Sequence, residues 1–168
     1  VQMSEAEIRR ANDIPKGSQD AQTLFFLGRQ AYTQALCRAN CERAAALYAQ
    51  AVSIDDRNAL AHASLSIAKF TRHVFRWSDT IEAEFEAAIQ HRDRARLLDP
   101  NLQYTLVASA WILFAEHKFT AALAALDRIA RAAPLAGGNA FANLALAKAN
   151  VGRAAEAETE LLRVIRVT

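Results

Sequence analysis

The stretch that decides the fold runs from Gln103 to Pro134 and reads QYTLVASAWILFAEHKFTAALAALDRIARAAP. Apolar residues recur at helical spacing in its first part, and again from Phe119 onward, which predicts two amphipathic helices. The polar run Glu116-His117-Lys118 separates them. Small residues such as Ala122 let the helices approach closely, and Pro134 ends the second one because proline cannot donate an interior helical hydrogen bond. This stretch therefore predicts a helix, a tight turn and a second helix.

The same pattern of small contact residues and polar or proline stops recurs in three other parts of the chain, around Ala44, Ala88 and Ala157. Gly152 falls at the turn of the last copy, where glycine adopts a left-handed conformation at least cost. The first copy carries about four extra residues, and the second about ten, which we assign to an insertion over Thr71–Thr80. We predict four helix pairs, over residues 21–56, 57–100, 101–134 and 135–168.

The composition supports an all-α chain. Of the 168 residues 52% are apolar, while 5 glycines and 3 prolines are too few to punctuate a many-stranded β fold. No apolar run approaches the roughly 18 residues of a membrane span, and no signal peptide is legible. A net charge of +2 is too small to indicate nucleic-acid binding. We expect a cytoplasmic protein with no direct nucleic-acid or membrane contact.

The two ends of the sequence lead to separate expectations. Ser4 and Glu7 form a capping box that opens a short helix. A loop is predicted over residues 12–20, with Asp20 capping the next helix, so residues 1–20 make an N-terminal helix and linker, and residues 21–168 the repeat domain. Because the chain begins at Val1 and stops within a helical pattern, we expect it to be a piece of a longer protein.

The Leu27-Gly28 pair, with the aromatic Tyr32 after it, resembles the tetratricopeptide repeat (TPR). The signature of that family places Leu-Gly, an aromatic residue, alanines and proline at fixed offsets, and the resemblance covers residues 21–167. It implies a right-handed α-solenoid of about four helix pairs whose first helices line a concave, partner-binding surface. Where the signature has glycine at the close helix contact, the later copies have other small residues: Ser66, Ala110 and Ala145.

A narrower likeness concerns the second copy. The segment Arg76-Trp77-Ser78-Asp79, followed by a long helix that ends at Asp99-Pro100, is similar to TPR regions attached to bacterial class III adenylate cyclases and to winged-helix transcriptional regulators. No cyclase residue can be carried over, since no part of a cyclase domain is present. The likeness implies a regulatory piece of a larger bacterial signalling protein.

No residues form a recognisable catalytic or metal site, and we predict no enzyme activity, metal or cofactor. Cys37 and Cys41 could form a metal pair or redox couple, but zinc needs four ligands and none of the others is nearby, so both are interpreted as packing residues. Of the four histidines, which lack helical-turn partners, His62 is expected in the core and His117 in solvent. The other two are His73 and His91.

The concave surface that the resemblance implies is lined by aromatic and aliphatic side chains, with one cation among them. An exposed apolar surface of this kind needs a cover. We expect an apolar helical or extended segment of a protein partner, held by aromatic anchors and oriented by Arg29. The candidate residues are Phe25, Arg29, Tyr32, Ile67, Phe70, Tyr104, Val107, Trp111, Phe114 and Leu146.

Three alternatives to a partner segment on this surface remain. The surface could mediate self-association, or it could close into a pocket that senses a small molecule. The N-terminal helix or the Thr71–Thr80 insertion, with Phe75 and Trp77, could also fold back and fill it. A clamp for a C-terminal carboxylate is not expected, because it needs several polar residues at these positions.

Overall fold

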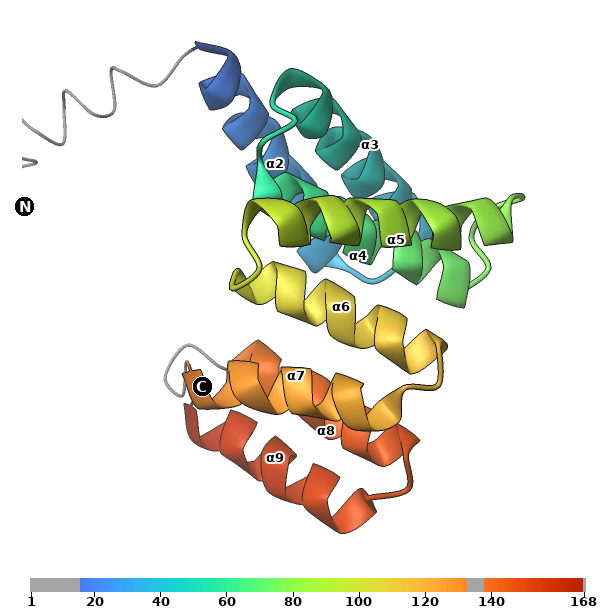
Figure 1. Cartoon of the computed structure of the whole chain (residues 1–168), viewed down its shortest axis with the longest axis vertical. Coiled ribbons are helices and arrows are strands. Elements are labelled where there is room, and N and C mark those ends of the chain that lie inside the picture. Colours follow the sequence, from blue (N-terminus) through green and yellow to red (C-terminus); the bar gives the residue numbers. More distant parts are fainter. Residues whose placement is uncertain (1–15, 133–137, 168) are drawn as a thin grey trace, which may run out of the picture. The chain divides into compact units, whose positions relative to one another are not determined.

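The computed structural model describes residues 16–132 and 138–167, whose regular structure is entirely helical (Figure 1). Consecutive helices pack in adjacent pairs, so the predicted all-α fold of helix pairs is confirmed. The pairs are α2 (Lys16–Gln34) with α3 (Arg38–Ile54), α4 (Ala59–Val74) with α5 (Ile81–Leu98), α6 (Gln103–Ala115) with α7 (Phe119–Ala132), and α8 (Gly138–Asn150) with α9 (Ala154–Val167).

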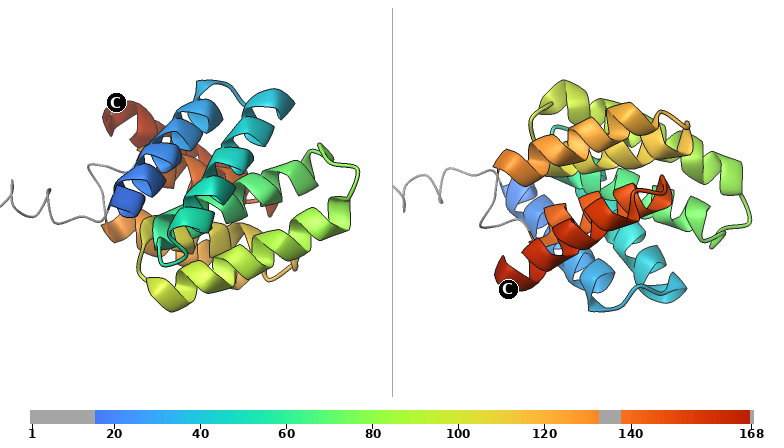
Figure 2. Two further views of the ribbon diagram at one scale, coloured as in Figure 1. Left: turned by 90° about the horizontal axis from the view of Figure 1, so that it is seen from above. Right: turned by 90° about the horizontal axis from the view of Figure 1, so that it is seen from below.

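The chain divides into two compact units, Val1–Asp99 and Pro100–Thr168. In the first unit α2, α3 and α4 contribute to one core, and in the second unit α6, α7 and α8 contribute to another. The two helices of each pair run side by side, as Figure 2 shows for α4 and α5. The first core includes Phe25, Ala44, Tyr48, Leu65 and Ala68. The second includes Ala110, Leu126, Ile129, Leu144 and Ala147.

Two expectations about segment ends fall partly outside the described residues. The predicted N-terminal helix that opens at Ser4 lies outside them, as does Pro134, although α7 does end just before it, at Ala132. The loop predicted to extend to Asp20 is wrong in its last part, because α2 already begins at Lys16. Asp20 therefore lies within a helix and does not cap one.

The first two helix pairs share a register at one end. In each of them the second helix ends ten residues after its buried contact alanine. The first helices α4 and α6 each begin seven residues before their own small contact residue. The alanines and the helix ends they precede are Ala44 and Ile54, and Ala88 and Leu98.

Because of this register, differences in length lie at the turn between the paired helices. The predicted Thr71–Thr80 insertion is only partly a loop, since residues 71–74 form the last turn of α4. The remaining extra residues lengthen the loop and the start of α5. Trp77 packs against the first core, and the ring of Phe75, which is 49% exposed, stacks on it at 4.7 Å. The second pair is thus a longer hairpin with an aromatic tip.

Three of the turns between paired helices use the same hydrogen-bonding motif. The second residue after the helix has a positive φ, and the next N–H donates to a carbonyl five residues back, as in a Schellman cap. Gly152 takes this position as predicted, with a φ of 79°. The other two residues are Arg76 and His117, with φ of 54° and 61°. The bonds run from Trp77 to Arg72, from Lys118 to Leu113 and from Arg153 to Lys148.

Gly28 is buried within α2, where it lies against α3. A Cβ atom there would lie 2.7 Å from Cε1 and 2.8 Å from Cδ1 of Tyr48 on α3. The Tyr48 ring cannot easily move aside, because it is buried and its centroid lies 5.8 Å from that of Phe25. A glycine is therefore required here by the approach of the neighbouring helix.

We expect Gly28→Ala to lower the free energy of unfolding by about 1–3 kcal/mol, because the overpacking outweighs the helix propensity that alanine gains. The measurement is urea unfolding of the single variants and of the double variant with Tyr48→Leu, which removes the ring. The cost of Gly28→Ala should shrink in the Tyr48→Leu background. Strictly additive costs would contradict the contact.

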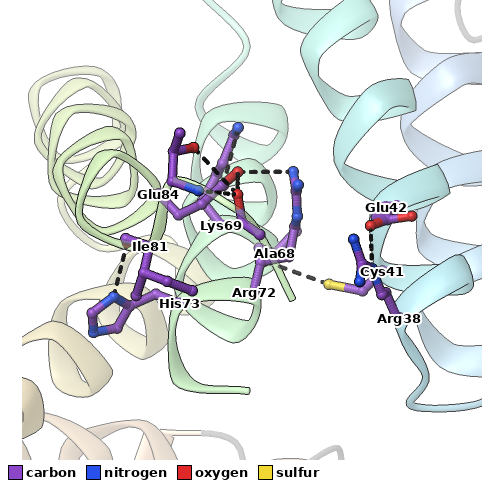
Figure 3. Close-up of polar contacts among 11 residues, drawn as sticks. Arg38, Cys41, Glu42, Ala68, Lys69, Arg72, His73, Ile81 and Glu84 are labelled. Carbon is purple, nitrogen blue, oxygen red and sulfur yellow. Dashed lines mark hydrogen bonds and ion pairs between the residues drawn. The ribbon is translucent and has the colours of Figure 1, made fainter. Parts of the chain in front are cut away.

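A buried carboxylate joins the long hairpin near its tip. Glu84 of α5 is 5% exposed and lies between two cations of α4, as Figure 3 shows. Its Oε2 is 3.1 Å from Lys69 Nζ and its Oε1 is 3.0 Å from Arg72 Nη1. The hydroxyl of Ser78 also donates to Oε1. This cluster connects the first turn of α5 with the last turns of α4 and with the loop.

We expect Glu84→Gln to lower the free energy of unfolding by about 2–4 kcal/mol, since it leaves two partly buried cations without their counter-charge. The matched control is Glu86→Gln, which removes an exposed carboxylate of the same helix and should change stability by about 0.5 kcal/mol or less. Chemical denaturation of both variants measures the difference. Equal effects would show that the buried contact contributes nothing.

Candidate interaction surface

Two of the residues predicted to line the binding surface lie on α2, and they differ in burial. Phe25 is only 3% exposed and packs in the first core against Tyr48. Arg29, one turn further along α2, is exposed. Phe25 is therefore a core residue rather than an accessible anchor, while Arg29 remains available to a ligand.

Tyr32 is half-buried and ties α2 to α4. Its hydroxyl oxygen lies 2.8 Å from Oγ1 of Thr71. The Thr71 hydroxyl donates to the carbonyl of Ile67 at 2.9 Å, so Tyr32 is the donor in the bond between the two side chains. This bond fixes the phenol ring against α4.

Two further predicted residues lie on α4 and are half-buried, Ile67 and Phe70. The ring of Phe70 has its centroid 6.4 Å from those of His73 and Phe85, so it faces the aromatic contact between α4 and α5. His73 in turn stacks on Phe85 at 4.7 Å. In the first unit most predicted surface residues are therefore engaged in packing between helices.

The second unit presents a continuous stripe on α6. Tyr104, Val107, Trp111 and Phe114 follow one another at helical spacing, and all four are half-buried. Val107 and Phe114 pack against the second core. The Trp111 ring lies 5.7 Å from that of Phe114. That these side chains bind a partner stays a prediction.

The start of α7 adds an aromatic residue that the sequence analysis did not select. Phe119 is 40% exposed, and its ring centroid lies 5.6 Å from that of Phe114. Trp111, Phe114 and Phe119 together form what we call the aromatic cluster. The signal was the aromatic residue directly after the Glu116-His117-Lys118 turn, which we interpreted only as the beginning of a helix.

Leu146 is the exposed member of the set on α8. It is 54% exposed, whereas Leu144 and Ala147 on the same helix are buried in the second core. A leucine that points to solvent from a helix with a well-packed opposite face adds apolar surface without contributing to that core.

The two cysteines have different environments, although both are free thiols. Cys41 is buried in the first core, and its thiol lies 3.5 Å from the carbonyl of Ala68. Burial raises the pKa of the Cys41 thiol to about 11. Cys37 is exposed at the N-cap of α3. The interpretation as a packing residue is confirmed for Cys41 and is wrong for Cys37.

We expect native protein to react with a thiol reagent at Cys37 and to leave Cys41 unmodified, because the thiolate is the reactive form and Cys41 is both buried and protonated at neutral pH. Titration with Ellman's reagent should count one thiol before and two after denaturation. The Cys37→Ser variant is the control and should show almost none until it unfolds. Fast reaction of both native thiols would contradict this assignment.

The histidines also differ. His117 is exposed at the α6–α7 turn, and His62 is buried and hydrogen-bonded, as predicted. The sequence did not reveal that His91 meets His62 across the α4–α5 interface, with 3.0 Å between their Nδ1 atoms. Within the described ranges, no group of three or more His, Cys, Asp or Glu side chains is arranged to hold a metal ion.

Comparison with solved structures identifies the fold. A structure described as the functional characterization of Pseudomonas aeruginosa pilF matches with a TM-score of 0.63 over 92% of this chain. PilF is a TPR-containing protein. The chain has the fold of a tetratricopeptide repeat protein. At 22% sequence identity the likeness concerns the TPR fold alone, and this chain spans 64% of the length of that one.

Neither a protein-family model nor a curated protein matches the sequence. Among the described residues of this TPR fold, none of the helices combines the length and apolar character that crossing a membrane requires.

Proposed function

We propose that this chain is a non-enzymatic protein-interaction module that binds an apolar segment of a protein partner. In the same proposal it serves as the regulatory part of a larger, cytoplasmic bacterial signalling protein. The observation that carries the proposal is the aromatic cluster of the second unit. The TPR-like fold supports it, because arrays of helix pairs create extended binding surfaces.

The aromatic cluster has the properties of a binding hot spot. Trp111 and Phe114 are held on α6, a regular helix, and Phe119 adds an exposed ring at the start of α7. Aromatic side chains on regular helices offer large apolar contact at a small loss of conformational entropy, and tryptophan is among the residues most often found at hot spots. Leu146 adds a separate aliphatic contact on α8.

The chemistry of the surface indicates the kind of ligand. The ring of Phe114 contacts those of both Trp111 and Phe119, and the neighbouring charges of Glu116 and Lys118 pair with each other at 2.8 Å. A charged ligand would gain little from such a surface, whereas a leucine or phenylalanine of a partner helix would bury apolar area. Among the predicted surface residues of the first unit, Arg29 is the exposed cation, and it would interact with a polar part of a partner.

We expect Trp111→Ala to weaken binding about thirtyfold or more, because truncating an aromatic hot-spot residue typically costs about 2 kcal/mol or more. The probes are amphipathic helical peptides selected by display against the unmodified chain. Binding is measured by calorimetry and stability by thermal unfolding. Phe119→Ala should act in the same direction. Leu97→Ala, which truncates an exposed leucine of the first unit, is the control and should leave binding unchanged.

The outcomes separate the alternatives. Equal losses of binding and stability in Trp111→Ala would make Trp111 a core residue and contradict the proposal. A dimer that dissociates in Trp111→Ala, seen by sedimentation, would instead support self-association. A thermal shift with small molecules alone would support a sensor domain.

A further inference from the structure

We propose that the hydrogen bond between His62 and His91 is an acid-sensitive contact that holds α4 against α5, away from the hairpin tip. We call it the histidine contact. His62 lies in the first turn of α4 and His91 in the second half of α5, and His62 bonds to the link from α3. The two rings face each other, with 5.2 Å between their centroids. This inference does not depend on the partner-binding function.

The hydrogen bonds define which ring nitrogens carry hydrogen when both histidines are neutral. His62 Nε2 lies 3.1 Å from the backbone carbonyl oxygen of Asp56, which can only accept, so Nε2 carries the hydrogen. Neutral His62 then has an unprotonated Nδ1. The 3.0 Å contact between the Nδ1 atoms is satisfied only if His91 donates from its Nδ1. The neutral state therefore has one defined arrangement of protons.

Additional protons are unfavourable in this arrangement. A first proton places a cation in a buried site, since His62 is only 5% exposed. A second would put two N–H donors and two positive charges against each other, which requires the rings to separate. Acid therefore favours an opened α4–α5 contact.

The surrounding charges add to this effect. The guanidinium of Arg94 on α5 lies 3.1 Å from the carboxylate of Asp56 and repels a charged His62, while Lys69 on α4 repels a charged His91. The carboxylates of Asp55 and Asp56 act in the opposite sense on His62. Burial is the largest influence on both rings, and it outweighs these carboxylates.

The lowered pKa values of the two histidines determine how the stability of the α4–α5 contact depends on pH. Burial, with repulsion from His62 and Lys69, lowers the pKa of His91 to about 4, against about 6.5 in an unfolded chain. Burial also lowers the pKa of His62. Between pH 6.5 and 4 the unfolded or opened state therefore binds more protons than the closed state. The histidine contact therefore stabilises the closed α4–α5 packing fully above pH 6.5, and this stabilisation is lost as the pH falls.

The experiment follows hydrogen exchange of α4 and α5 peptides in the full chain at several pH values between 7.5 and 5, corrected for intrinsic exchange. Protection in the unmodified chain should fall with pH. His91→Asn keeps an N–H donor near His62 Nδ1 but cannot titrate, so its protection should depend much less on pH. The matched control is His117→Asn, because asparagine tolerates the positive φ at that exposed turn.

A second measurement needs no variant. Heteronuclear NMR of the unmodified chain should find hydrogen on Nε2 of His62 and on Nδ1 of His91, and both rings should titrate below the ordinary pKa. Equal pH dependence of protection in the unmodified chain and in His91→Asn would overturn the proposal. So would titration of both rings near pH 6.5 as independent groups, and this result stands even if His91→Asn does not fold.

Discussion

Each helix pair depends on the close approach of two helices at a small residue. Gly28 leaves room for the Tyr48 ring, and the hydroxyl of Ser66 donates to the carbonyl of Ala88 at 2.7 Å across the second pair. Ala122 has no exposed surface. A larger side chain at such a site would separate the axes and expose the aliphatic residues that pack around the contact. The abundance of alanine in the sequence is thus a consequence of geometry.

Polar contacts add specificity to packing that alanine contacts alone would leave weakly defined. In the long hairpin, Glu84 fixes the part near the tip and the histidine contact fixes a part away from it. The last pair contains a comparable contact, because Lys148 Nζ lies 2.8 Å from the buried Glu160. Apolar contacts tolerate sliding along the helix axis, whereas each of these polar contacts is satisfied at one register only.

The repeat pattern predicted the helix pairs and the Gly152 turn, since periodicity and small-residue spacing are local properties of the chain. It did not predict contacts between residues far apart in sequence. His62 and His91 are 29 residues apart, and only the pairing of α4 with α5 brings them together. Phe25 was misplaced because neighbouring turns of α2 supply both core and surface, and the repeat position alone did not distinguish them.

The length of the helix pairs varies at one end only. In the first two pairs the second helix ends at the same distance from its contact alanine, while the hairpin of α4 and α5 is longer on the turn side. A pair can therefore lengthen at its turn without shifting the connection to the next pair. Insertions and deletions at these turns provide an evolutionary route by which such a protein could acquire new tips while conserving the joints between its modules.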